Sequence, residues 1–143
     1  MAEPEHGSSP LAEALVKVGD RWTLLVVEAL LGGPQRFNDL LGQIPGIAAN
    51  ILSERLKRLE REGLLMAPPY SERPPRAAYQ LTAEGAELAG VLRLLARWGA
   101  RHADLAEATR HTACGTPLEA RWYCPTCDHL VDHEPRGVEV SYL

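Results

Sequence analysis

Hydrophobic residues recur every three or four positions through most of the first hundred residues of the chain. This spacing places apolar side chains along one face of an α-helix. Serine, proline and glycine interrupt the pattern at positions where helices commonly begin and end. The expected helices start at Ser9-Pro10 and run to residue 19, then span residues 21–31, 37–44 and 47–62, and a long fifth helix follows Thr82.

Two shorter apolar segments, residues 64–70 and 77–81, have the character of β-strands. The stretch between them is basic and rich in proline. Pro74-Pro75 cannot lie inside a central strand because proline has no backbone N–H to donate, so we expect both at the tip of a hairpin. The chain is therefore predicted to be mainly α-helical with a small β-hairpin wing, followed by a small C-terminal Cys/His knuckle segment.

Residues 37–62 have the layout of a helix-turn-helix, with a short helix, a Pro45-Gly46 turn and a longer amphipathic helix. In such motifs the second helix lies in the major groove of DNA. Together with the hairpin, this layout predicts a winged helix-turn-helix. One side of the longer helix carries the residues expected to face the core, which are Ala48, Leu52, Leu56 and Leu59.

The opposite side of the longer helix carries candidate DNA contacts. Asn50, Ser53 and Lys57 share that side, and Ala49 and Arg61 lie near them. Asparagine can read an adenine edge through two hydrogen bonds, serine can bond a base or a phosphate, and lysine can reach a phosphate. Every soluble helix has a polar face, so the interpretation also depends on the turn before this helix and the basic hairpin after it.

Three arginines outside this helix are further candidates for DNA contact. Arg36 directly precedes the third helix, and Arg73 and Arg76 lie in the predicted hairpin tip. From the tip, an arginine can contact phosphates or the minor groove. A solvated surface loop is the alternative reading of Arg73 and Arg76.

The formal net charge of −4 argues by itself against a nucleic-acid partner. However, residues 21–100 carry ten basic and eight acidic side chains, and the segments on either side are acidic. Within this positive segment, Arg55 lies at the border of the apolar face. It either reaches a phosphate or pairs with Asp39 or Glu54, and we favour the ion pair.

The length of 143 residues and a hydrophobic content of 45% suit one domain with a small appendage. No apolar run approaches the roughly 20 residues of a membrane helix, and the N-terminus lacks the regions of a signal peptide. We expect a cytoplasmic protein with no membrane contact. Its expected parts are a flexible N-terminus (1–9), a winged helix-turn-helix domain for DNA binding and dimerisation (10–108) and a zinc-ribbon-like C-terminal segment (109–143).

Specific motifs accompany this layout. They are Gly19, Trp22 to Leu25, Arg36-Phe37, Pro45-Gly46-Ile47, Asn50, Leu52, Glu54-Arg55-Leu56, Gly63-Leu64, Pro74-Pro75-Arg76 with Tyr79, Leu81-Thr82 and Gly85. On these residues, roughly positions 10 to 100 resemble the HxlR-type winged-helix transcriptional regulators, which are relatives of the MarR group. The resemblance implies a homodimer packed through its N-terminal and long C-terminal helices and bound to a palindromic promoter element. We favour a repressor that competes with polymerase for that element.

Two positions depart from the family pattern. Ser9-Pro10 stands where many members carry a Cys-Pro pair that can serve as a thiol switch, so we expect no redox sensing there. Ala48-Ala49 stands at the start of the recognition helix, where many members have Ser-Pro or a similar pair. The missing hydroxyl is expected to alter which bases or phosphates are contacted.

All three cysteines lie in the C-terminal segment. His111 and Cys114 form an HxxC pair, and Cys124 and Cys127 form a CxxC pair, with nine residues between Cys114 and Cys124. This Cys3His set has spacings that a structural zinc accepts. Such a closed site would stabilise a segment that lacks a core of its own, and it would not be catalytic.

Several alternatives stay open. His129 and His133 compete as the fourth zinc ligand, and a redox-active or unligated CxxC pair competes with zinc itself. The main functional alternative is a winged-helix interaction platform whose zinc-stabilised tail docks a partner. A small-molecule effector could bind near Trp22 and Trp98, although apolar residues at helical spacing more often form plain core. No Ser/His/Asp arrangement, glycine-rich phosphate loop or set of convergent carboxylates indicates an enzyme.

Overall fold

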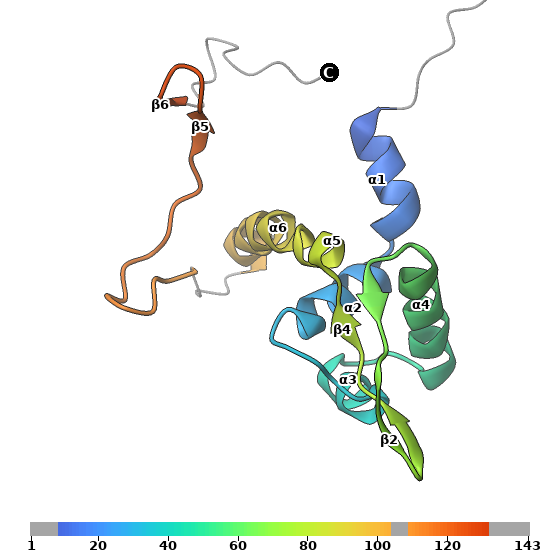
Figure 1. Ribbon diagram of the computed structural model, residues 1–143. Coiled ribbons are helices and arrows are strands. Elements are labelled where there is room, and N and C mark those ends of the chain that lie inside the picture. The colour runs from blue at the N-terminus through green and yellow to red at the C-terminus, as the bar shows by residue number, and fades with distance from the viewer. Residues whose placement is uncertain (1–8, 104–108, 132–143) are drawn as a thin grey trace, which may run out of the picture. The chain divides into compact units, whose positions relative to one another are not determined.

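The computed structural model describes residues 9–103 and 109–131 of the chain (Figure 1). Internal contacts divide the chain into two compact units, Met1–Leu92 and Arg93–Leu143. Residues 1–8 of the expected flexible N-terminus lie outside the described residues, and so does His133. The domain boundary expected between residues 108 and 109 stays a prediction.

Four helices precede the wing. They are α1 (Pro10–Val18), α2 (Arg21–Leu30), α3 (Phe37–Gln43) and α4 (Ala49–Arg61). The first two begin where the sequence predicts, because each has a side-chain acceptor at its N-cap. Ser9 Oγ accepts the Ala12 N–H at 3.1 Å, and Asp20 Oδ1 accepts the Thr23 N–H at 3.0 Å.

Helix α4 ends in a glycine turn that reverses the chain toward the wing. Gly63 has φ +72°, a conformation that glycine adopts at low cost. The Gly63 N–H donates to the Glu60 carbonyl at 3.0 Å, and the Leu64 N–H donates to the Leu59 carbonyl at 2.9 Å. This is the Schellman arrangement, in which the apolar residues on either side of the turn, here Leu59 and Leu64, are both buried.

The wing is built from four short strands. They are β1 (Leu65–Met66), β2 (Pro69–Glu72), β3 (Pro75–Ala77) and β4 (Gln80–Leu81). Antiparallel pairing joins β1 to β4 and β2 to β3, and β2 and β3 extend away from the helices (Figure 1). Gln35 and Tyr79 exchange backbone hydrogen bonds of 2.9 and 2.8 Å, which attach the entry of α3 to the wing.

The hairpin tip is shorter than predicted. The sequence placed residues 71–76 in the tip, but Ser71 and Glu72 belong to β2 and Pro75 opens β3, paired with Glu72. Proline is tolerated there because the first residue of a strand in a two-stranded hairpin need not donate to a ladder. The turn itself therefore consists of Arg73 and Pro74.

The single long helix expected after Thr82 is instead divided into α5 (Ala83–Ala86) and α6 (Leu88–Ala103). Thr82 Oγ1 accepts the Gly85 N–H at 3.1 Å and donates to the Gly63 carbonyl at 2.7 Å. Gly85 packs so closely on the turn between α4 and β1 that a Cβ built on it would lie 2.0 Å from the Leu64 carbonyl oxygen. This close approach connects the start of α5 to the end of α4.

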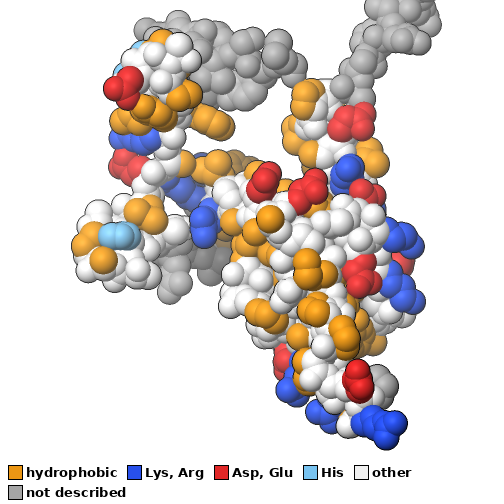
Figure 2. Space-filling model, in the orientation of Figure 1, with side chains coloured by type: hydrophobic (Ala, Val, Ile, Leu, Met, Phe, Trp, Pro, Cys, Tyr) orange, Lys and Arg blue, Asp and Glu red, His pale blue; other side chains and the backbone are white. Residues whose placement is uncertain are grey.

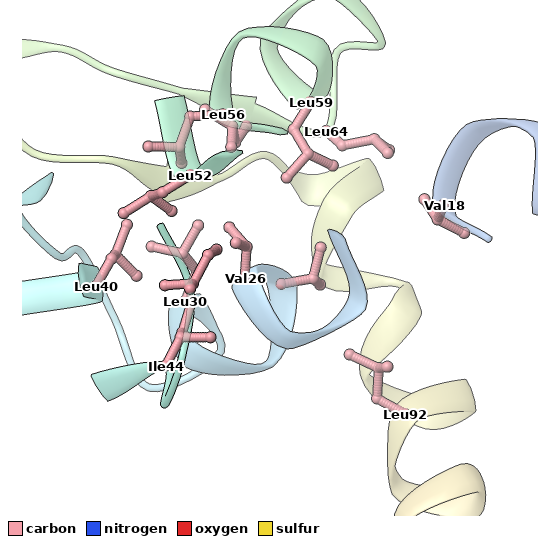
Figure 3. Close-up of a cluster of buried hydrophobic side chains, with 13 residues drawn as sticks. Val18, Val26, Leu30, Leu40, Ile44, Leu52, Leu56, Leu59, Leu64 and Leu92 are labelled. Carbon is pink, nitrogen blue, oxygen red and sulfur yellow. The ribbon is translucent and has the colours of Figure 1, made fainter. Parts of the chain in front are cut away.

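The hydrophobic core of the first unit lies between the helices and the base of the wing (Figure 3). Three leucines of α4, Leu52, Leu56 and Leu59, are buried as the sequence predicts. Ala48 is exposed, so its predicted place on the apolar face is wrong. It precedes α4 in extended conformation, where the helical period no longer fixes its direction. The other buried apolar residues are Val18, Val26, Val27, Leu30, Leu40, Ile44, Ile47, Leu64, Leu65 and Leu92.

The C-terminal segment forms a second small hairpin from β5 (Trp122–Cys124) and β6 (His129–Val131). Before it, Arg110 and Pro117 pair as an isolated antiparallel bridge. Among residues 109–131, every side chain except those of Cys124 and Val131 is exposed. Within the described residues, no helix is both long and apolar enough to span a membrane.

Candidate nucleic-acid interface

Helix α4 has a buried apolar side and an exposed polar side, and the polar side carries the predicted DNA contacts. Asn50 and Lys57 are exposed, as is Ala49 at the first turn, whereas Ser53 is half-buried. Since Leu52, Leu56 and Leu59 fix the opposite side in the core, the rotation of the helix about its axis is set by packing. The polar side is therefore presented outward in one fixed orientation.

An ion-pair cluster connects α4 to the N-terminus of α2. Arg55 Nε donates to Asp20 Oδ1 at 2.9 Å, and Arg58 Nη1 lies 3.7 Å from Asp20 Oδ2. Arg55 Nη1 also lies 3.0 Å from Glu54 Oε1. The predicted pairing of Arg55 with Glu54 is confirmed, but the alternative partner Asp39 accepts a hydrogen bond from the Arg36 backbone N–H instead.

Asp20 is the charged residue of this site that the sequence reading missed. Burial alone would raise the pKa of its carboxyl, but hydrogen bonds from Thr23 and Arg55 outweigh burial and hold the pKa at about 2. An aspartate before a helix signals an N-cap in the sequence. Its second role depends on Arg55, which lies 35 residues further along and meets it only in the folded chain.

The cluster separates the basic residues of α4 into two groups. Arg55 and Arg58 are occupied by Asp20, and Arg58 also donates to the backbone carbonyl of Val16 at the end of α1. Lys57 and Arg61 are exposed, and neither makes an ion pair within the part of the chain that the structure describes. The charges left for a phosphate backbone on this helix are therefore Lys57 and Arg61.

The wing carries a second basic surface. Arg73 and Arg76 are exposed, and basic side chains gather at the tip that projects from the helices (Figure 2). Arg73 lies in the turn itself and Arg76 lies in β3, opposite Ser71. A projecting, positively charged hairpin is suited to the DNA backbone or the minor groove.

Arg36 lies where α3 meets the wing. Its guanidinium carbon is 5.2 Å from the ring centroid of Tyr70 in β2, a cation–π contact. Its backbone N–H donates to Asp39 Oδ2 at 3.2 Å, which ties down the first turn of α3. Arg36 is exposed, so the guanidinium stays accessible while the Tyr70 ring restricts its position.

The four predicted metal ligands lie in two pairs in the C-terminal segment. His111 Nδ1 lies 3.2 Å from Cys114 Sγ, and Cys124 and Cys127 are hydrogen-bonded neighbours at the β5–β6 turn. Hydrogen bonds with Thr116 and His111 lower the pKa of the Cys114 thiol, and hydrogen bonds with Cys127 lower that of Cys124. Within the described residues, no three His, Cys, Asp or Glu side chains form a group that could hold a metal ion.

Comparison with known proteins decides the family. The model of the HxlR-like helix-turn-helix family matches residues 17–107, which include α2, α3, α4 and the whole wing. The chain belongs to the HxlR-like helix-turn-helix family. This membership confirms the resemblance inferred from the motifs. The predicted winged helix-turn-helix fold is confirmed as well.

Similar proteins agree with this membership. An HTH-type transcriptional regulator of Mycobacterium tuberculosis is 36% identical over 121 residues, covering 82% of this chain and 76% of its own length. YvaP of Bacillus subtilis, an HTH-type transcriptional regulator, is 39% identical over 84 residues, covering 59% of this chain and 78% of its own. The solved structure of the B. subtilis transcriptional regulator YodB in its reduced form superimposes with a TM-score of 0.57 and 31% identity, covering 68% and 97%.

The HxlR-like chain is therefore a transcriptional regulator with a helix-turn-helix DNA-binding domain, and not an enzyme. Its family segment, residues 17–107, contains no cysteine, since Cys114, Cys124 and Cys127 all follow it. Thiol chemistry in this chain is thus confined to the C-terminal segment.

Proposed function

We propose that this regulator is a homodimeric repressor that occupies a palindromic promoter element and so competes with polymerase. The proposal is supported by the way the side chains of α4 are divided between a packed side and an exposed side. Its leucines are buried, Arg55 and Arg58 are held by Asp20, and Asn50 and Lys57 are presented outward. A helix fixed by packing and ion pairs on one side can present the other to a groove with little loss of conformational freedom.

The residues that would contact base edges lie in the first two turns of α4. Asn50 is exposed and can donate to and accept from an adenine edge, which makes it the main base-reading residue. Ala49 is small, so the first turn of the helix can approach the bases closely. Ser53 lies one turn further and is half-buried, which favours a contact with a phosphate or base edge close to the helix surface.

Phosphate contacts come from basic residues on three elements. Lys57 lies two turns beyond Asn50 on α4, Arg36 lies at the start of α3, and Arg73 and Arg76 lie on the wing. Contacts of this kind fix the register of the protein on the duplex and supply salt-dependent affinity, without reading sequence. The wing arginines would reach the backbone or the minor groove beside the major groove that α4 enters.

Dimerisation is supported by two helices with exposed apolar side chains. On α1, Leu11, Leu15 and Val16 are 67%, 50% and 68% exposed. On α6, the exposed apolar residues are Val91, Leu94, Leu95 and Trp98. Apolar residues grouped along one helix are a common mark of a subunit interface, and a two-fold dimer would place its two α4 helices on half-sites of a palindrome.

The proposal is tested by fluorescence anisotropy with DNA from upstream of the regulator's own gene and scrambled DNA of the same length. Titrations at two salt concentrations should show tighter binding to the upstream DNA and a fall in affinity as salt rises. Equal, weak binding to both DNAs would contradict sequence-specific repression. It would favour the interaction platform, in which the same domain serves as a docking surface for another protein.

A further inference from the structure

We propose that His111, Cys114, Cys124 and Cys127 together bind one structural zinc ion, which closes the C-terminal segment into a small ribbon. The proposal concerns the second unit alone and is independent of the DNA-binding function of the first. It rests on the local geometry of the two ligand pairs, on their donor chemistry and on the exposure of the segment that contains them.

The first pair lies in a tight turn that already holds both ligands on one side. The Gly115 N–H donates to the His111 carbonyl at 2.7 Å, and the His111 N–H donates to the Thr116 carbonyl at 2.9 Å. These bonds bring His111 Nδ1 to 3.2 Å from Cys114 Sγ. Two ligands of one tetrahedral zinc, with usual Zn–N and Zn–S bonds, lie about 3.6 Å apart. The pair is therefore within a few tenths of an ångström of the zinc-bound spacing.

The second pair occupies an equivalent turn. Cys124 is the last residue of β5 and is paired with His129, the first residue of β6, so Cys127 lies inside the connecting turn. The residue after each pair has a left-handed backbone, with φ +71° at Gly115 and φ +54° at Asp128. Asp128 is the one residue other than glycine with positive φ among those the structure describes. The HxxC-Gly and CxxC-Asp loops thus share a residue of positive φ directly after the second residue of each pair.

The donor set selects the metal. Three thiolates and one imidazole are soft and borderline ligands, which suit tetrahedral zinc and suit Ca²⁺ or Mg²⁺ poorly. Four protein ligands fill the coordination sphere and leave no position for water or substrate. The ion would therefore be structural, as in zinc ribbons.

The segment needs such an ion because it has no core. Among the described residues 109–131 none is buried, and Leu118, Trp122, Tyr123 and Leu130 are each about half exposed. A segment this short cannot bury enough apolar surface to offset the entropy of ordering it. Metal binding supplies that free energy directly, since the site exists only in the folded form.

Zinc binding requires the two turns to close on a shared ion. The ten peptide units from Cys114 to Cys124 span up to about 35 Å when extended, so the connection permits this closure. His111 is a stronger candidate for the fourth ligand than His129, because its Nδ1 already lies 3.2 Å from Cys114 Sγ, whereas the hydrogen bond of the His129 ring is to the Cys127 carbonyl oxygen and not to a sulfur.

Elemental analysis of the full-length protein, purified with reductant and supplied with zinc, tests the proposal. The wild type should retain about one zinc per chain after dialysis. Cys114→Ser and Cys124→Ser should each lower the retained zinc by more than about tenfold. His111→Ala should do the same, whereas the matched control His129→Ala should retain the wild-type amount.

A second measurement keeps the test independent of how each variant folds. Cobalt(II) titrated into the reduced wild-type protein should give the absorption bands of a tetrahedral site with thiolate ligands, saturate at about one equivalent and disappear on addition of zinc. Zinc retained by Cys114→Ser, zinc lost equally from His129→Ala and His111→Ala, or a wild type that binds neither metal would each overturn the proposed ligand set.

Discussion

Arg55 on α4 donates from its Nε to the Asp20 carboxylate at the N-terminus of α2, with 2.9 Å between the two atoms. Because Arg58 reaches the other oxygen of the same carboxylate, one acid holds two arginines of the recognition helix. The pair orients α4 from its core-facing edge. Because Asp20 contacts both arginines, the positive charges of Arg55 and Arg58 are not available to DNA.

Replacing Asp20 with asparagine should lower the stability of the winged helix in a pH-dependent way. The pKa of Asp20 is lowered from 3.8 to about 2 in the folded chain, so its ionised form contributes about 2 kcal/mol at neutral pH. A depressed carboxyl pKa means that this contribution is complete above the unfolded value and is lost as pH falls through the folded value. Urea unfolding of the wild type and Asp20→Asn at several pH values should show their difference shrinking to about half by pH 3. A difference that stays constant from pH 7 to pH 3 would contradict the assigned role.

Arg55→Ala and Lys57→Ala each remove one positive charge from α4, at positions two residues apart, but they should affect different properties. Arg55→Ala should change the stability of the fold, and Lys57→Ala should change DNA binding. Arg55→Ala leaves Asp20 without its closest cation and should destabilise the fold. Lys57→Ala should leave stability within about 0.5 kcal/mol of the wild type, because Lys57 is exposed, and lower the salt slope of DNA binding by about one unit. Thermal unfolding and anisotropy on both variants distinguish the two roles. Arg93→Ala, an exposed arginine on α6, serves as the charge-matched control that changes neither quantity.

Gly85 should be intolerant of any side chain. An added Cβ would lie 2.0 Å from the Leu64 carbonyl oxygen, which is backbone and cannot rotate away. Gly85→Ala should therefore cost about 1–3 kcal/mol by forcing α5 from the end of α4. Gly90→Ala on α6, where nothing lies within 4 Å of the added carbon, should instead stabilise by about 0.5–1 kcal/mol. Chemical denaturation of the two alanine variants provides the comparison, and equal effects would show that the close approach does not matter.

Leu95→Glu should convert the proposed dimer to a monomer without unfolding it. Leu95 is 48% exposed on α6, so a charge there costs little in the single chain and much at an apolar interface. Light scattering on the eluting protein would report the mass, and Arg101→Glu on the same helix is the control that should remain dimeric. A Leu95→Glu protein of unchanged mass would exclude this face of α6 from the dimer interface.

The sequence predicted most of the fold because its helices carry strong local signals. Ser9 and Pro10 begin α1, Gly63 ends α4, and the leucine spacing of α4 gave the correct buried side. The errors arose where the backbone leaves a regular period. Ala48 precedes its helix, Pro75 begins a strand, and the expected long helix after Thr82 is interrupted at Glu87.

The sequence predicted which residues of α4 are exposed at the candidate interface, but it did not predict the ion pairs that two of its arginines make with Asp20. The residues predicted to face outward on α4 are exposed, with Ser53 partly covered. The engagement of Arg55 and Arg58 with Asp20 could not be read from the chain, since it depends on how α2 packs against α4 in three dimensions. Local spacing did predict both cysteine-containing turns, because the two residues of each predicted ligand pair are only three positions apart in the sequence.

If α4 reads DNA sequence, Asn50→Ala should weaken binding to the cognate element and to no other DNA. Affinities of the wild type and this variant would be measured by anisotropy on the upstream element and on scrambled DNA, at one salt concentration. We expect a loss of about 1–3 kcal/mol in binding free energy on the upstream element and no change on scrambled DNA. An equal loss on both DNAs, or no loss on either, would contradict base reading by this helix.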